Sequence, residues 1–177
     1  MIEYTHTGKK GYSKHMQSNI IHESFKYGEN LKLGNYCIIE EDVIVGDNVD
    51  IQNYVLLKKG TRIGNDCYVD SYFRSSGDNF IGNNVTLRFG STIARKVMVE
   101  DNVFISPNVM TVYSLPDGQK SSGTFIGENA FIGTAVVLAP NISIRPGSII
   151  GANSFVNKSI LEKGIYVGNP AKMLRKL

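Results

Sequence analysis

The sequence predicts an all-β protein whose backbone coils into a parallel β-helix of six-residue repeats. First, five short segments of one pattern begin 18 residues apart, and their first residues are Tyr27, Val45, Ile63, Ile81 and Val99. Second, the next such segment begins at Ile126, nine residues late. A fixed period of three six-residue steps is typical of a triangular coil, and the delay indicates that one coil carries an inserted loop.

The strands are predicted from the positions that recur every six residues. From Leu33 these anchor positions are aliphatic except at Ser75, and they read Leu33, Ile39, Val45, Ile51, Leu57, Ile63, Val69, Ser75, Ile81, Leu87, Ile93, Val99 and Ile105. Four residues after each anchor comes a second inward position with a smaller side chain, such as Cys37 or Val43. A helical period would scatter this pair of positions, whereas a short strand holds alternate side chains on one face.

The corners are predicted from the third residue after each anchor, which is usually Asn, Asp or Gly: Asp42, Asn48, Gly60, Asp66, Asp78, Asn84, Gly90, Asn102 and Asn108. These residue types tolerate the left-handed backbone conformation that a sharp corner needs. Three corners close a triangle, and successive coils stack about 4.8 Å apart. The register resumes at Ile126 and runs to Val156, so we expect about seven coils.

Length and charge narrow the class of protein. The chain has 177 residues and a formal net charge of +3, which predicts one domain and no groove for nucleic acid. The first 20 residues are polar, and no apolar stretch is long enough for a membrane span, so we expect a cytoplasmic location. We divide the chain into a polar N-terminal extension (1–20), a β-helix domain (21–161) and a C-terminal tail (162–177). Cys37 and Cys67 are expected to be unpaired and buried.

Together with the closing segment Val167-Gly-Asn-Pro-Ala-Lys172, the repeats resemble the left-handed β-helix hexapeptide-repeat acyltransferases over residues 21–177. The resemblance implies the left-handed sense of the coil, a homotrimer, and acyl-CoA, here acetyl-CoA, in the groove between neighbouring subunits. It implies that Pro170, Ala171 and Lys172 lie at the CoA end of that groove. Because Arg175 is positively charged, we also expect it to contact a phosphate of CoA. The alternative is that Pro170 only ends the last coil.

Four small residues of the late coils are further candidates for cofactor binding: Gly133, Thr134, Gly151 and Ala152. Small side chains allow a pantetheine arm to approach the backbone amides closely. A purely structural role is equally open, because Gly recurs after the anchors along the whole chain.

The inserted loop lies within 113–123, where Pro116-Asp117-Gly118 predicts a turn. Through Ile105-Ser-Pro-Asn-Val109 this stretch resembles the galactoside and maltose acetyltransferases, in which a catalytic histidine follows on the loop. The corresponding place here is Leu115-Pro116, and the three histidines of the chain, His6, His15 and His22, lie at or before the first coil. We therefore assign no catalytic residue.

The missing histidine favours an amine as the acyl acceptor. A sugar hydroxyl needs a positioned base before it attacks a thioester, whereas an amine with a pKa near about 8 is partly neutral and nucleophilic at physiological pH. Some members of the family acetylate nucleotide-linked amino sugars in surface polysaccharide pathways. The resulting hypothesis is transfer of acetyl from acetyl-CoA to such an amine, with backbone amides stabilising the oxyanion.

The acceptor candidates are two arginines and three residues in or near the loop: Arg74, Arg88, Asn108, Tyr113 and Asp117. Arg88 takes the place of an acceptor-contacting asparagine of the galactoside-type relatives, and a bidentate guanidinium suits a diphosphate or a carboxylate. A plain surface pair with Asp70 is the alternative. Beside Arg74, Ser75 and Asn79 occupy inward positions, so either these polar groups are buried and hydrogen-bonded or the coil bulges.

Three other functions compete with this hypothesis. One is a sugar O-acetyltransferase that takes its base from an acidic loop residue or from a histidine of another subunit. Another is a zinc hydratase on the same fold, which requires three histidines at one site, whereas all three here precede the coils. We therefore expect no metal. The last is a non-catalytic β-helix scaffold, for which the loop and the Pro-Ala-Lys end have no evident use.

Overall fold

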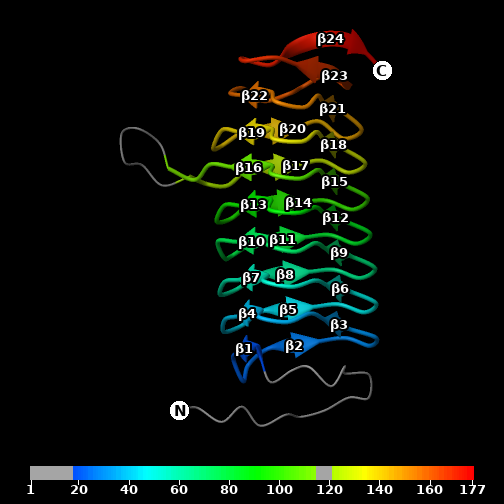
Figure 1. Cartoon of the computed structure of the whole chain (residues 1–177). Helices are drawn as coiled ribbons and strands as arrows, with labels where there is room; N and C mark the ends of the chain where they lie inside the picture. Colours follow the sequence, from blue (N-terminus) through cyan, green and yellow to red (C-terminus); the bar gives the residue numbers. More distant parts are fainter. Residues whose placement is uncertain (1–17, 115–120) are drawn as a thin grey trace.

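A computed structural model of the chain, which describes residues 18–114 and 121–177, is a three-sided parallel β-solenoid (Figure 1). Sheet A contains β1 (Ile20–Ile21), β4 (Ile38–Ile39), β7 (Leu56–Leu57), β10 (Arg74–Ser75), β13 (Thr92–Ile93), β16 (Met110–Thr111), β19 (Val137–Leu138) and β22 (Phe155–Val156). Sheet B contains β2 (Lys26–Tyr27), β5 (Ile44–Val45), β8 (Arg62–Ile63), β11 (Phe80–Ile81), β14 (Met98–Val99), β17 (Phe125–Ile126) and β20 (Ser143–Ile144).

The third side, sheet C, ends in an antiparallel pair. It contains β3 (Lys32–Leu33), β6 (Asp50–Ile51), β9 (Tyr68–Val69), β12 (Thr86–Leu87), β15 (Phe104–Ile105), β18 (Phe131–Ile132), β21 (Ile149–Ile150), β23 (Gly164–Val167) and β24 (Lys172–Lys176). Only β23 and β24 pair antiparallel, and they lie at the C-terminal end of the solenoid in Figure 1. The parallel β-helix predicted from the repeats is therefore confirmed.

The strand register reproduces the period of the sequence. Ile38 pairs with Leu56, 18 residues later, whereas Met98 pairs with Phe125, 27 residues later. The inserted segment thus lies between β16 and β17, as the nine-residue delay predicted. The solenoid has about eight turns where the anchors predicted about seven, because the first turn uses the partly buried Ile21 and Tyr27 as inward side chains before the aliphatic anchors begin. The left-handed sense stays an expectation from the family resemblance.

The predicted anchors form the core. Every anchor from Leu33 to Val156 is buried, and so are the smaller inward positions from Cys37 to Val103. A fully buried aliphatic side chain contributes about 1.5–3 kcal/mol, so the stacked anchors stabilise a fold in which the described residues form almost no helix. Cys37 and Cys67 are unpaired and buried, as predicted.

Three edges join the sheets, and we name each by the sheets it separates. The AB edge includes turns 40–42, 58–60, 76–78 and 94–96; the BC edge includes 28–30, 46–48, 64–66 and 82–84; the CA edge includes 34–36, 52–54, 70–72, 88–90, 106–108, 133–135 and 151–153. The predicted corner residues, from Asp42 to Asn108, all have positive φ. On the BC edge, Asp47 Oδ1 accepts the backbone N–H of Glu29 at 2.6 Å, so these side chains also tie neighbouring turns together.

Candidate functional site

The residues predicted to bind the cofactor lie in one column along the CA edge. The backbone N–H of Asn153 donates to Thr134 O at 2.9 Å, which stacks turn 151–153 on turn 133–135. Above them, Ala171 N–H donates to Phe155 O at 2.8 Å and brings the Pro-Ala-Lys segment onto the top of sheet A. Gly133, Thr134, Gly151, Ala152, Pro170 and Ala171 are thus brought together from three consecutive layers of the solenoid.

Packing within the chain accounts for the two glycines of this column. A Cβ atom at Gly133 would lie 2.7 Å from the backbone N of Ala152, and one at Gly151 would lie 2.7 Å from Val167 Cγ1. The same obstruction occurs at Gly64 and Gly82, far below the column. Stacking of turns therefore requires glycine here with or without a ligand, while Thr134 and Ala152 beside them are exposed.

Two cations stand at the upper end of the column. Lys172 and Arg175 lie on the exposed strand β24, and neither forms an ion pair with another residue of the described ranges. Their neighbour Lys176 differs, because its Nζ lies 2.7 Å from Glu162 Oε2. Lys172 and Arg175 therefore offer positive charge that no nearby carboxylate neutralises, which suits the phosphates of CoA.

Arg88 and Asn108 occupy lower turns of the same CA edge. Arg88 Nε lies 3.2 Å from Asp70 Oδ2, and its guanidinium lies 5.9 Å from the ring centre of Tyr68. The predicted Asp70–Arg88 pair is thus present, and it leaves the Arg88 side chain 43% exposed. Burial, and secondarily the Asp70 charge, raises the pKa of Tyr68, so this phenol stays a neutral hydrogen-bonding group. Asn108 is exposed and holds the corner with φ of 57°.

The remaining acceptor candidates do not join this column. Arg74 is exposed on the outer face of β10, between Leu56 and Thr92 of the neighbouring strands. Tyr113 is partly buried against the core after β16. Asp117 lies outside the described residues, as do His6 and His15. His22 is exposed, and its Nδ1 lies 2.9 Å from Ser24 Oγ.

An aromatic ladder continues the CA edge below Arg88. The ring centres of Tyr36 and Tyr54 are 5.2 Å apart, those of Tyr54 and Tyr72 are 4.9 Å apart, and those of Tyr72 and Phe89 are 5.4 Å apart. The three tyrosines have φ between 58° and 63°, where the other edges mostly place Asn, Asp or Gly. Sequence reasoning missed the ladder, although its tyrosines are spaced 18 residues apart.

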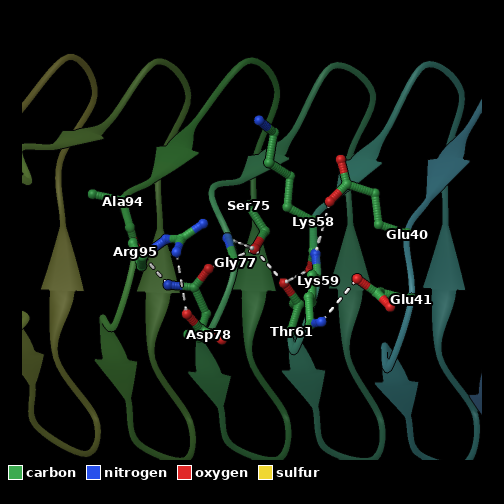
Figure 2. Close-up of polar contacts among 11 residues, drawn as sticks. Glu40, Glu41, Lys58, Lys59, Thr61, Ser75, Gly77, Asp78, Ala94 and Arg95 are labelled. Atoms are coloured by element: carbon green, nitrogen blue, oxygen red, sulfur yellow. Dashed lines mark hydrogen bonds and ion pairs between the residues drawn. The ribbon is translucent and has the colours of Figure 1, made fainter.

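The polar inward positions are buried and hydrogen-bonded, so the coil does not bulge there. Ser75 Oγ donates to Asn79 Oδ1, and Asn79 Nδ2 donates to the carbonyl of Ala94, both at 2.5 Å. Figure 2 shows this network at the AB edge, where Ser75 Oγ also meets Thr61 Oγ1 and accepts the N–H of Gly77. On the outside of the same edge, Lys59 Nζ lies 2.8 Å from Glu41 Oε1, and its hydrogen bond and charge lower the pKa of Glu41.

A groove of about 790 Å³ runs over the outer face of sheet B beside the AB edge. Its lining includes four cations and two carboxylates, with apolar side chains between them: Lys26, Lys59, Arg62, Lys96, Asp42, Asp78, Ile44, Phe80 and Met98. Ser122, at the end of the inserted segment, also contributes. Sequence reasoning missed this groove; the available clue was the outward residue that precedes each sheet B anchor, such as Arg62 before Ile63.

Residues 123–158 match the family described as bacterial transferase hexapeptide (six repeats). These residues of the chain are thus similar to the repeats of that transferase family. It is 34% identical over 115 residues to the galactoside O-acetyltransferase of Escherichia coli, a match that covers 58% of this chain and 57% of that enzyme. This chain is also 36% identical over 112 residues to a putative acetyltransferase of Saccharomyces cerevisiae. It spans a little over half the length of each of these two curated relatives.

Two solved structures share the fold. The UDP-N-acetylglucosamine acyltransferase of Bacteroides fragilis superimposes with a TM-score of 0.71 at 20% identity, covering 89% of this chain and 72% of that one. A mutant of the N-acyltransferase AntD from Bacillus cereus, in complex with dTDP-4-amino-4,6-dideoxyglucose and coenzyme A, superimposes with a TM-score of 0.57 at 20% identity, covering 85% and 82%. Because both structures are only 20% identical to this chain, these similarities show a shared solenoid fold and nothing more.

Within residues 18–114 and 121–177, no three His, Cys, Asp or Glu side chains come together as metal ligands. The same ranges contain no helix long and apolar enough to cross a membrane.

Proposed function

We propose that the protein is an acetyl-CoA-dependent acetyltransferase that acts on the amine of a nucleotide-linked amino sugar, as a cytoplasmic homotrimer. The observation that supports an amine as the acyl acceptor is the position of the histidines. The loop contains none, and His22, the one histidine in the described ranges, follows β1, five strands of sheet A away from β16. At about 4.8 Å per strand it stands about 24 Å from the start of the inserted segment.

The proposed roles follow the CA edge. Acetyl-CoA lies along the column of Thr134 and Ala152, with its phosphates toward Lys172 and Arg175. Backbone N–H groups of the coil would hold the thioester oxygen, as oxyanion donors do in acyl transfer. The acceptor amine attacks the thioester carbonyl, the C–S bond breaks, and the departing thiolate takes the surplus proton of the attacking nitrogen directly or through water, which leaves a neutral amide and the CoA thiol.

Arg88, Asn108 and Tyr113 would orient the acceptor beside the thioester, and Arg74 and Asp117 are the outlying candidates. Positioning of two reactants is itself a large source of rate, so the absence of a base does not leave the reaction without catalysis. The N-acyltransferase AntD, whose structure holds an amino sugar nucleotide and coenzyme A, supports this assignment by analogy of fold.

The test pairs each nucleotide-linked amino sugar with its hydroxyl counterpart. Acetyl-CoA and the full chain are incubated with both, thiol release is followed, and the product is identified by mass spectrometry. We expect acetylation of the amine and none of the hydroxyl analogue. Release of thiol only with the hydroxyl analogue, or with simple galactosides, would overturn the assignment of an amine as the acceptor.

A sugar hydroxyl is the second candidate, favoured by the 34% identity to a galactoside O-acetyltransferase. It requires a base, either an acidic loop residue or a histidine of another subunit, and substitution of His6, His15 and His22 in turn tests the histidine. Loss of activity on any one substitution, with the fold intact, would favour the hydroxyl acceptor.

A further inference from the structure

The groove over sheet B lies apart from the CA edge and takes no part in the roles above. Its floor is the outer face of consecutive strands, with Ile44, Arg62, Phe80 and Met98 in direct register. Lys26 begins the same row, and Lys96 stands at the AB edge in the turn that leads to Met98. The row is continuous, so a ligand in the groove would meet these side chains in this order.

The charges of the groove are only partly neutralised within the chain. Lys59 pairs with Glu41 at 2.8 Å, and Asp78 faces Arg95 at 3.6 Å. In contrast, Lys26, Arg62 and Lys96 form no ion pair within the described ranges. Asp42 is the carboxylate that lines the groove without such a partner. An excess of positive charge remains, and it selects for an anionic ligand.

The apolar side chains restrict the ligand further. Phe80 is 48% exposed and follows Arg62 in the row, and Met98 is 50% exposed and follows Phe80, in the same turn of the solenoid as Lys96. An exposed ring next to a planar guanidinium is a surface on which a flat aromatic base stacks. Arg62 lies two strands from Lys26 and two from Met98, about 10 Å in each direction. A compact anion would reach one cation, whereas an elongated ligand with a base and a diphosphate would reach several.

From this arrangement we infer that the sheet B groove binds a nucleoside diphosphate group, with the base on Phe80 and Met98 and the phosphates on Arg62. The volume of about 790 Å³ lies in the range of small-molecule sites. This inference rests on the proposed function in one respect, because we assign the group to the nucleotide-linked acceptor. CoA also carries a nucleoside diphosphate, so the experiment must separate the two sources.

The experiment titrates the full chain with UDP, dTDP and CoA in separate calorimetric arms. The test variants are Arg62→Gln and Phe80→Leu. Arg145→Gln and Phe131→Leu are matched controls, because Arg145 is exposed on the BC edge and Phe131 is exposed on sheet C, both away from the groove. Removal of a charge-assisted contact should weaken binding of UDP or dTDP about tenfold or more. Phe80→Leu should weaken it less, and the controls and CoA should show wild-type affinity.

Three results would overturn the inference. They are equal nucleotide affinity in Arg62→Gln and Arg145→Gln, no binding of either nucleotide at millimolar concentration, and a loss of CoA affinity alone in Arg62→Gln, which would assign the groove to CoA. Both test side chains are exposed, and a thermal melt confirms that the variants fold. Failure of the proposed function has a different signature, since nucleotide binding would respond to Arg62→Gln while no amine is acetylated.

Discussion

The buried network around Asn79 predicts a measurable loss of stability in the variant Asn79→Val. Asn79 is 1% exposed, donates to the Ala94 carbonyl and accepts from Ser75 Oγ. Valine has a similar size and occurs at many of the equivalent inward positions, such as Val43 and Val97. The substitution therefore removes two hydrogen bonds from the core with little change in volume.

The magnitude follows from the partners left behind. The Ala94 carbonyl loses its side-chain donor, and a buried group left unsatisfied costs about 1–3 kcal/mol. The Ser75 hydroxyl is less affected, because it can turn to Thr61 Oγ1. Burial of the apolar valine side chain in place of the amide stabilises the folded state by about 1 kcal/mol. The net loss is about 1 kcal/mol, which lowers the melting temperature of a chain of this size by about 2–4 °C.

Differential scanning calorimetry measures this shift. Asn157→Val is the matched control, because Asn157 is exposed and makes no hydrogen bond with its side chain within the described ranges, so its effect should stay within about 0.5 kcal/mol. A melting temperature of Asn79→Val at or above that of the wild type would refute the reasoning. It would mean that the aliphatic pattern alone, without the polar network, stabilises this turn.

Three further predictions concern protonation and catalysis. Burial raises the pKa of the Cys67 thiol to about 11 from 9.0, so between pH 9 and 11 the folded state keeps a proton that the unfolded state loses, and the free energy of unfolding should fall by up to about 3 kcal/mol. Urea titrations should show a shallower fall in Cys67→Ala, and an equal fall in both proteins would contradict this prediction. The variant His22→Ala should keep wild-type thiol release from acetyl-CoA, and abolished activity would show that His22 supplies a base. Lys172→Gln should raise the KM for acetyl-CoA about fivefold, by about 1 kcal/mol, with kcat unchanged; an unchanged KM would remove Lys172 from the cofactor site.

The fold could be predicted from the sequence because its determinants are local and periodic. Each anchor, such as Ile39 or Leu57, needs only to be aliphatic and six residues from the next, and each corner needs a residue that tolerates positive φ. The shifted register at Phe125 could also be predicted from the sequence, because an insertion shifts every later anchor by the same nine residues. Even the exception at Ser75 was visible as a break in the pattern.

The candidate site was less predictable, because the period does not reveal which outward positions form a recess. Arg62 and Arg74 each precede an anchor position, Ile63 and Ser75, yet Arg62 lines a groove on sheet B and Arg74 stands on sheet A outside it. The tyrosines at 36, 54 and 72 contradict the residue preference of the corners, and their stacking depends on contacts between turns. Aromatic pairs contribute about 0.5–1.5 kcal/mol, comparable with the cost of positive φ.

The two proposed binding regions constrain the assembly when taken together. The column of Thr134 and Ala152 lies on the CA edge, whereas Arg62 and Phe80 lie on sheet B beyond the AB edge, so the width of sheet A separates them in one chain. Acyl transfer requires the amine and the thioester carbon to approach within about 3–3.5 Å. If CoA occupies the column and the acceptor nucleotide occupies the groove, the reacting atoms can meet only where the CA edge of one subunit faces sheet B of another. A neighbouring subunit, as in the proposed homotrimer, would then be a requirement of the reaction, and a monomeric variant should bind both substrates and transfer no acetyl group.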